Sequence, residues 1–280
     1  MITSSLLPEQ PLDRGVVGRF APSPSGRMHL GNIAAAWLSW KSVRERGGKW
    51  ILRIEDIDRG RSRLEWAKWI EDDLSWLGLD WDEGGLEGKG EYGPYVQSER
   101  NALYEAALAK LSESGLTYPC SCTRGEVLAA RAPHASDGNV VYSGRCRPEP
   151  GKIIIPREGR QPATRLIVPD RDISFVDRIS GLHTYNLAHD CGDFIVRRSD
   201  GGWAYQLAVV VDDALMGVSE VVRGEDLLES TACQLYLYEL LGWRAPEFAH
   251  IPLMRNEDGE RLSKRDRSLS MEELRRTCTP

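Results

Sequence analysis

Residues 15–40 of the chain read Gly-Val-Val-Gly-Arg-Phe-Ala-Pro-Ser-Pro-Ser-Gly-Arg-Met-His-Leu-Gly-Asn-Ile-Ala-Ala-Ala-Trp-Leu-Ser-Trp, and this stretch decides the fold. Its apolar start predicts a strand near 15–20, and the run from Ile33 predicts a helix over about 30–46. The turn between them leaves N–H groups at the helix start unpaired, and these carry partial positive charge that suits phosphate. His29 stands where the helix begins. The alternative is an ordinary strand-to-helix connection with a surface histidine.

A short basic segment far downstream reads Arg261-Leu-Ser-Lys-Arg265 and follows the turn sequence Asn256-Glu-Asp-Gly259. By itself such a segment is typical of a solvated face. Paired with Met28-His29-Leu30-Gly31, however, it resembles the two signatures of class I aminoacyl-tRNA synthetases, His-Ile-Gly-His and Lys-Met-Ser-Lys-Ser. The order and separation of the two segments make the resemblance specific, although Arg261 replaces the usual first lysine.

The composition is that of an ordinary globular protein, with 280 residues, 41% of them hydrophobic and 28% charged. We expect one catalytic domain plus an insertion. The net charge of −6 excludes a global attraction to nucleic acid, so any RNA contact must come from local basic patches. Residues 1–14 lack the features of a signal peptide, and no apolar run has the length of a membrane span. We therefore expect a cytoplasmic monomer whose six cysteines are thiols or metal ligands.

The start of the chain alternates strand and helix, which predicts a parallel sheet with crossover helices. From Leu116 the sequence changes to cysteines, prolines and short irregular pieces, which we interpret as an insertion. The expected strands lie near 15–20, 50–54, 193–197, 204–211 and 220–223, and the expected helices near 30–46, 62–78, 98–114 and 227–241. The expected divisions are a tail (1–14), the first half of a Rossmann-like α/β catalytic domain (15–115), an inserted zinc-containing subdomain (116–185), the second half (186–245) and a C-terminal segment (246–280).

Ligands of an open parallel sheet bind beyond the carboxyl ends of its strands. Four residues are expected at or near such strand ends: Arg19, Glu55, Tyr205 and Arg223. The sequence around them resembles glutamyl-tRNA synthetases. The matching stretches are Arg19-Phe-Ala-Pro-Ser-Pro-Ser-Gly26, Leu52-Arg-Ile-Glu-Asp-Ile-Asp58, Trp203-Ala-Tyr-Gln-Leu-Ala-Val-Val-Val-Asp-Asp213 and Val222-Arg-Gly-Glu-Asp226. The resemblance assigns these residues to a glutamate pocket: Arg19, Phe20, Ala21, Pro22, Ser23, Glu55, Tyr205 and Arg223.

An anionic substrate fits this set, because two arginines hold two carboxylates in charge-assisted pairs and Glu55 meets the ammonium group. A structural salt bridge is the alternative for Arg223. The resemblance also assigns an ATP site, in which His29 and Lys264 are catalytic: His29, Gly31, Asn32, Ser263 and Lys264. There the glutamate carboxylate attacks the α-phosphate, releases pyrophosphate and leaves glutamyl-adenylate. Mg²⁺ is expected on the phosphates, with no residue assigned to it.

Three cysteines, Cys120, Cys122 and Cys146, lie in the irregular segment. Buried thiols are the alternative, but three cysteines in a small domain without a regular core favour zinc, which replaces missing apolar stabilisation. The spacing leaves the fourth ligand open between His134 and Tyr142. Some synthetase paralogues have Cys-x-Cys followed by Tyr-x-x-x-Cys, and this resemblance indicates Tyr142, although the segment before Tyr142 is longer here. The other cysteines belong to neither the Cys-x-Cys nor the Tyr-x-x-x-Cys pattern and are expected to be inert: Cys191, Cys233 and Cys278.

About fifteen residues follow Arg265, where a discrete glutamyl-tRNA synthetase carries a large anticodon-binding region. The chain therefore resembles the paralogues that lack this region and attach glutamate to queuosine in the anticodon loop of tRNA(Asp). This resemblance implies L-glutamate, ATP and queuosine-containing tRNA(Asp) as substrates. The alternatives are a truncated glutamyl-tRNA synthetase that charges the tRNA 3′ end, a small-molecule nucleotidyltransferase of the same fold, and a zinc-stapled RNA-binding paralogue without catalysis.

Overall fold

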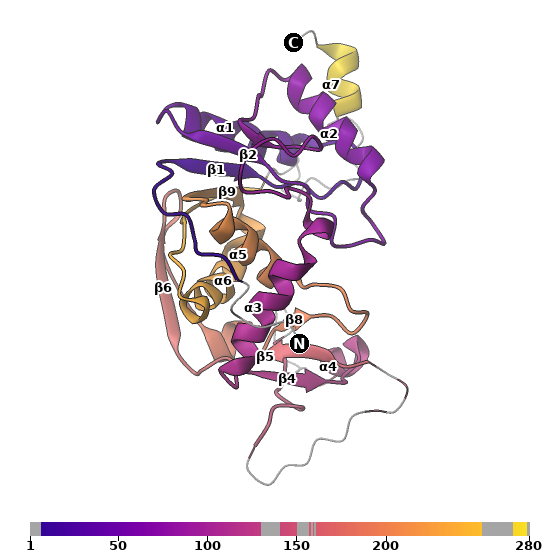
Figure 1. The fold of residues 1–280 in the computed structure, drawn as a ribbon, viewed down its shortest axis with the longest axis vertical. Helices are drawn as coiled ribbons and strands as arrows, with labels where there is room; N and C mark the ends of the chain where they lie inside the picture. The colour runs from indigo at the N-terminus through magenta and orange to yellow at the C-terminus, as the bar shows by residue number, and fades with distance from the viewer. Residues whose placement is uncertain are drawn as a thin grey trace, which may run out of the picture.

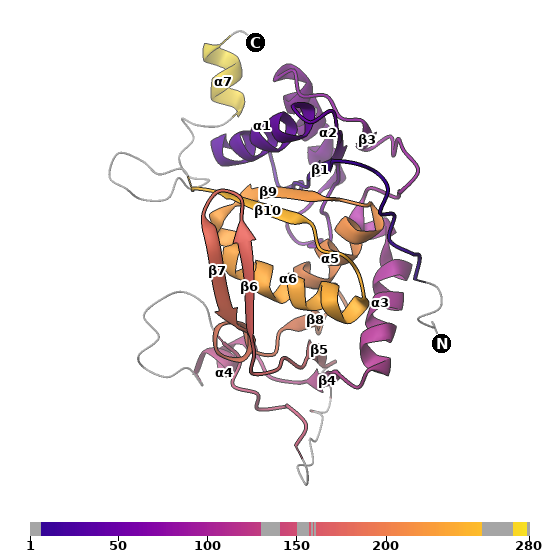
Figure 2. The same cartoon turned by 90° about the vertical axis from the view of Figure 1, so that its left-hand side faces the viewer.

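The computed structural model describes residues 7–129, 141–149, 157, 159, 161–253 and 271–278. In this part of the chain the centre is a five-stranded parallel sheet in the order β10-β9-β1-β2-β3 (Figure 1 labels β2, and Figure 2 labels β3 and β10). Its strands are β1 (Val17–Phe20), β2 (Lys49–Leu52), β3 (Glu83–Gly84), β9 (Glu220–Gly224) and β10 (Glu247–Ile251). The parallel α/β sheet expected from the alternation of strand and helix is confirmed.

Helices α1 (Leu30–Arg44) and α2 (Leu64–Trp76) cover one face of this sheet, and the other face carries α3 (Asn101–Glu113), α5 (Tyr205–Leu215) and α6 (Leu228–Leu241) (Figures 1 and 2). The close packing of α1 on β1 requires Gly18, because a Cβ there would collide with the Val43 side chain. The helices expected near 30–46, 62–78, 98–114 and 227–241 are present as α1, α2, α3 and α6, with ends that differ by a few residues.

The predicted strand over 204–211 is wrong, because these residues begin α5. Every residue from Leu207 to Leu215 is buried, so the helix has no polar face to mark a helical period. A short apolar run rich in valine is then indistinguishable from a buried strand by pattern alone. Tyr205 consequently lies at the first turn of a helix rather than at a strand end.

A second, antiparallel sheet has the order β4-β5-β8 and is formed by β4 (Thr117–Cys120), β5 (Ala163–Leu166) and β8 (Ile195–Arg197). A hairpin of β6 (Asp172–Asp177) and β7 (Gly181–Asn186) reaches back to the central sheet, where the Arg178 N–H donates to the Phe248 carbonyl at 2.9 Å (Figure 2). Strand β8 pairs with β5, although it lies past the proposed boundary at residue 185. The domain limits themselves remain a proposal.

The remaining regular elements are short. They are α4 (Arg124–Ala129), α7 (Met271–Thr277), the 3₁₀ turns Gln97–Glu99 and Glu225–Leu227, and a π-type turn at Leu187–Cys191. None of the helices in the described residues is both long enough and apolar enough to cross a bilayer.

Candidate active site

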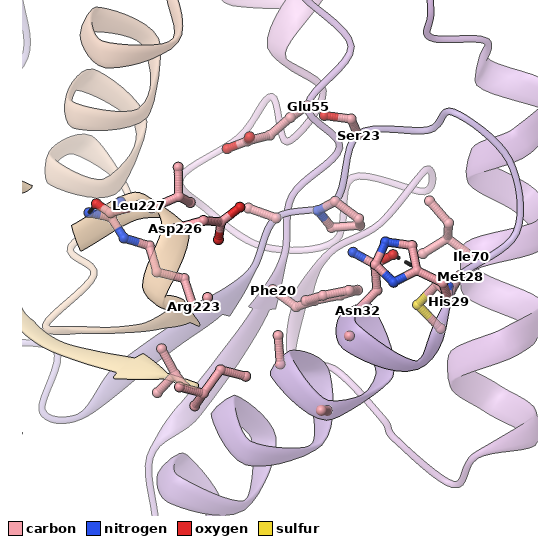
Figure 3. A pocket seen from close by; sticks show the side chains of 18 of the residues that line it. Phe20, Ser23, Met28, His29, Asn32, Glu55, Ile70, Arg223, Asp226 and Leu227 are labelled. Carbon is pink, nitrogen blue, oxygen red and sulfur yellow. Dashed lines mark hydrogen bonds between the residues drawn. The ribbon is translucent and has the colours of Figure 1, made fainter. Parts of the chain in front are cut away.

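A cavity of about 450 Å³ opens at the carboxyl ends of β1, β9 and β10, beside the amino end of α1 (Figure 3). This is where an open parallel sheet binds its ligands. Every predicted pocket residue that the structure describes lines it: Arg19, Phe20, Ala21, Pro22, Ser23, His29, Gly31, Asn32, Glu55, Tyr205 and Arg223. Ser263 and Lys264 lie outside the described residues.

The cavity has two chemically different ends (Figure 3). His29 and Asn32 lie on one side, at the start of α1, and Arg223 lies on the other with Leu227. His29 is the N-cap of α1, and its main-chain N–H donates to Asn32 Oδ1 at 3.4 Å. The first turn of α1 carries no acidic residue, so its positive end faces the cavity uncompensated. This end suits a phosphate group.

Glu55 is held by an arginine that sequence reasoning missed. Arg53 is fully buried and donates from Nη2 to Glu55 Oε1 at 2.9 Å and from Nη1 to Asp213 Oδ1 at 2.6 Å, while its Nε lies 3.7 Å from Asp212 Oδ2. Burial raises the pKa of Glu55, and the positive charge of Arg53 opposes that rise. Arg53 thus sits among three carboxylates, and it fixes Glu55 at the cavity wall.

Asp212 extends this buried network away from the cavity. It accepts hydrogen bonds from Arg100 Nε at 2.5 Å and Gln97 Nε2 at 2.7 Å, and it lies 3.0 Å from the Tyr104 hydroxyl. Two adjacent aspartates at the end of an otherwise apolar run are the sequence signal that could have revealed this network. Such buried charges persist only when they are paired.

Arg19 is partly compensated by the same network. Its Nε lies 3.4 Å from Asp213 Oδ1, without the geometry of a hydrogen bond, and its Nη1 donates to the Val222 carbonyl at 3.4 Å. The contacts of this buried guanidinium are therefore long. Although burial raises the pKa of Asp213, Arg53 and Arg19 together hold it below its usual range, so this carboxylate remains charged.

Arg223 is buried as well, but its partners are neutral. Its Nε donates to His250 Nε2 at 3.0 Å, its Nη1 to Gln234 Oε1 at 2.8 Å, and its Nη2 to Thr231 Oγ1 at 2.8 Å. No carboxylate among the described residues forms an ion pair with it. Burial and the positive charge of nearby Arg19 lower the pKa of Arg223, although Tyr205 and Asp213 act to raise it.

Tyr205 completes this end of the cavity. Burial raises the pKa of its phenol, so the hydroxyl stays protonated beside Arg223. The cavity wall therefore presents two buried guanidinium groups, a neutral hydroxyl and the Glu55 carboxylate, and the Asp226 carboxylate lines it too (Figure 3). This arrangement suits a ligand with two negative groups and one positive group.

Three cysteines converge at the end of β4, with their Sγ atoms within 4.8 Å of one another: Cys120, Cys122 and Cys146. Cys122 Sγ lies 3.5 Å from Cys146 Sγ, and the Tyr142 hydroxyl lies 3.4 Å from Cys120 Sγ and 3.7 Å from Cys122 Sγ. Tetrahedral zinc with Zn–S bonds of about 2.3 Å needs ligand atoms about 3.8 Å apart, so the four atoms fit this metal.

The proposed ligands differ in how easily they lose a proton. Although burial opposes it, hydrogen bonds from Tyr142 and Arg165 lower the pKa of Cys120 to about 7, so a thiolate forms readily there. Burial raises the pKa of Cys122 to about 11 and also raises the pKa of the Tyr142 phenol, so these two groups keep their protons when no metal is bound. The rival ligand, His134, lies outside the described residues.

Residues 15–277 match the family described as the catalytic domain of class I tRNA synthetases (E and Q). The glutamyl-Q tRNA(Asp) synthetase of Symbiobacterium thermophilum is 50% identical over 268 residues, which are 94% of this chain and 82% of the relative. The chain therefore belongs to the class I tRNA synthetases of the E and Q type. The glutamyl-Q tRNA(Asp) synthetase of Nitratidesulfovibrio vulgaris is 49% identical over 270 residues, with the same two shares of 94% and 82%. The family predicted from the sequence is thereby confirmed, and the protein is an enzyme of the ligase type.

A solved glutamate tRNA ligase from Elizabethkingia meningosepticum, in complex with its amino acid, superposes with a TM-score of 0.77 at 35% identity. The match covers 90% of this chain and 52% of that protein, so the chain spans about half the length of this structure. It confirms the class I catalytic fold, for which ATP and Mg²⁺ are expected. The roles of individual residues remain a proposal.

Proposed function

We propose that this chain activates L-glutamate with ATP to glutamyl-adenylate and transfers the glutamyl group to queuosine in the anticodon loop of tRNA(Asp). Relatives at about half identity carry the name of this activity, which supports the proposal. The residues of the cavity supply the recognition and positioning that the first step needs.

Glutamate binds at the arginine end of the cavity. Arg223 and Arg19 each pair with one substrate carboxylate, Tyr205 donates a hydrogen bond, and Glu55 accepts from the ammonium group. The observation that carries this assignment is Arg223, a buried cation whose described partners are all neutral. A charge-assisted hydrogen bond is worth roughly 1.5–3 kcal/mol, so the neutral amide of glutamine is rejected because it leaves a guanidinium unpaired.

ATP binds at the α1 end, with its phosphates at the helix start beside His29, Gly31 and Asn32. Ser263 and Lys264, outside the described residues, are proposed to contact it from the downstream signature segment. A glutamate carboxylate oxygen attacks the α-phosphorus, the bond to the bridging oxygen breaks, and pyrophosphate leaves. The protein positions the two substrates and stabilises the developing charge, and Mg²⁺ supplies further positive charge on the phosphates.

In the second step a queuosine hydroxyl attacks the glutamyl carbonyl, and AMP leaves with the bonding pair. Zinc, held by Cys120, Cys122, Cys146 and Tyr142, would stabilise the small antiparallel region that lacks a large apolar core. We propose that this region contacts RNA, in keeping with its place as an insertion in a synthetase domain.

A defined RNA acceptor tests the proposal. An isolated anticodon stem-loop of tRNA(Asp) is incubated with labelled glutamate and ATP, either with queuosine or with guanosine at the same position. We expect label only on the queuosine form, with an affinity that falls as the salt concentration rises, because basic side chains contact the RNA phosphates. If label instead reaches only the 3′-terminal adenosine of glutamate tRNA, the truncated glutamyl-tRNA synthetase is the correct function.

A further inference from the structure

His250, a buried histidine in β10, contacts Arg223 from the side away from the cavity. It is 1% exposed, and its Nε2 accepts the hydrogen bond from Arg223 Nε at 3.0 Å. On its other edge Nδ1 lies 2.6 Å from Asp177 Oδ2, at the end of β6. The three side chains therefore form a line from the hairpin, through the edge of the central sheet, to the substrate cavity.

The direction of each hydrogen bond follows from the chemistry of the end groups. Arginine has only donors, so His250 Nε2 must carry a lone pair, and the proton of the neutral ring must sit on Nδ1. Asp177 accepts that proton and also the main-chain N–H of His250, at 3.0 Å to the same oxygen. Its other oxygen accepts the main-chain N–H groups of Ile179 and Ser180 at 3.0 and 2.9 Å. Asp177 is thus fixed in place, and it selects one tautomer of the histidine.

We propose that His250 is a positioning residue for glutamate activation, whose Nδ1-protonated ring fixes the plane of Arg223 so that this guanidinium meets a substrate carboxylate. The inference rests on the proposed role of Arg223. Gln234 and Thr231 hold the terminal nitrogens, whereas His250 is the one acceptor among the described residues for Nε, the atom at which the guanidinium joins its side chain. A neutral acceptor at this point orients the arginine and leaves its charge for the ligand.

A pair of isosteric variants separates the two edges of the ring. His250→Asn retains a donor toward Asp177 and removes the acceptor for Arg223, whereas His250→Gln extends an amide oxygen to the position of Nε2. In glutamate-dependent ATP–pyrophosphate exchange, we expect His250→Asn to raise KM for glutamate about 10- to 100-fold and to change kcat far less. The KM of His250→Gln for glutamate should be at least fivefold lower than that of His250→Asn. His189→Asn, at an exposed histidine, is the matched control.

The imidazole ¹⁵N chemical shifts of His250 in the wild-type protein give a readout that does not depend on a variant folding. We expect a protonated Nδ1 and an unprotonated Nε2, and a protonated Nε2 would overturn the inference. An unchanged KM in a folded His250→Asn variant would overturn it as well. Arg223→Lys distinguishes this failure from that of the proposed function: if KM stays unchanged there, Arg223 does not bind glutamate, whatever the tautomer of His250.

Discussion

Two arginines of this molecule are both buried but have opposite surroundings. Arg53, with no exposed surface, contacts Glu55 and Asp213 directly and lies near Asp212. Arg223, which is 5% exposed, contacts a histidine, a glutamine and a threonine. The charge of the first arginine is compensated within the protein, whereas we propose that the second pairs with a negative group of the substrate.

This difference separates a structural charge from a binding charge. Burying an ion without a partner costs roughly several kcal/mol. We therefore expect an unpaired buried ion where a ligand supplies the partner. The comparison makes opposite predictions for the two arginines. Loss of Arg53 should harm stability, and loss of Arg223 should harm substrate binding while sparing stability.

The largest effect is expected for Arg53→Met, which keeps an apolar side chain of similar length and leaves Glu55 and Asp213 without their shared partner. The free energy of unfolding should fall by about 3–5 kcal/mol, the usual cost of breaking a buried ion pair. Urea denaturation measures it. Arg198→Met, which removes an exposed pair with Asp200, is the control and should cost at most about 1 kcal/mol. Equal losses of unfolding free energy in the two variants would contradict the structural role of Arg53.

Arg223→Gln should have the next largest effect, on activity alone. We expect kcat/KM for glutamate to fall about 10- to 100-fold, because the variant loses a hydrogen bond to a charged group, which is worth roughly 1.5–3 kcal/mol. The free energy of unfolding should stay the same or rise, since an uncompensated buried cation is gone. Steady-state exchange kinetics and urea denaturation of the same preparation measure both. A loss of stability as large as that of Arg53→Met would show that Arg223 is structural.

The cysteine cluster would represent a third form of compensation, in which the proposed zinc ion balances the charge of thiolates. We expect one zinc per chain by metal analysis, and chelation should loosen the antiparallel region. Tyr142→Phe removes only the hydroxyl, so zinc affinity should drop about tenfold or more while the ring packing stays. His134→Ala tests the rival ligand. Zinc lost from His134→Ala but retained in Tyr142→Phe would assign the fourth ligand to His134.

The smallest effect is a pH dependence at the Arg223 site. Burial and the neighbouring Arg223 lower the pKa of His250 to about 4, even though Asp177 acts to raise it. Between pH 6.5 and about 4 the unfolded chain therefore binds a proton that the folded chain does not, and stability decreases as the pH falls through this window. His250→Gln should remove up to one proton from the slope of unfolding free energy against pH. An identical slope in both proteins would contradict the assignment of a neutral His250.

The pH dependence has a second component below pH 4. Although burial opposes it, hydrogen bonds from the Ser180 main chain and from His250 hold the pKa of Asp177 below its usual range. Stability that depends on this carboxylate is present above its unfolded pKa near 3.9 and is lost on further acidification. The two windows are thus consecutive and have the same sign.

The sequence was sufficient to predict elements whose signals are local. Strand β1 and helix α1 follow from an apolar run, a Pro/Gly/Ser turn and a series of helix formers, and both are present. The apolar run that forms helix α5 instead predicts a strand, because every residue from Leu207 to Leu215 is buried. Strand β10 lacks such a local signal, because His250 interrupts its apolar pattern. The hydrogen bonds that make this histidine acceptable in a core come from Asp177, 73 residues away, and from Arg223.

The same distinction holds for the cavity. Resemblance to the synthetases led to the residues that line it, including Arg19, Glu55 and Arg223. It did not reveal Arg53 or His250, which stand behind those residues and contact partners far away in sequence. Residues that touch a ligand belong to short recognisable motifs, whereas residues that orient them are specified by tertiary pairing. Such pairings become visible only in the folded chain.

The central claim is that this cavity selects glutamate through an arginine the fold leaves uncompensated. ATP–pyrophosphate exchange in the absence of tRNA, with L-glutamate, L-glutamine and L-aspartate compared at equal concentration, tests it most directly. We predict exchange with L-glutamate, at least tenfold less with either analogue, and a collapse of the glutamate preference in Arg223→Gln. Exchange that needs tRNA, or a glutamate preference that survives in Arg223→Gln, would contradict the account.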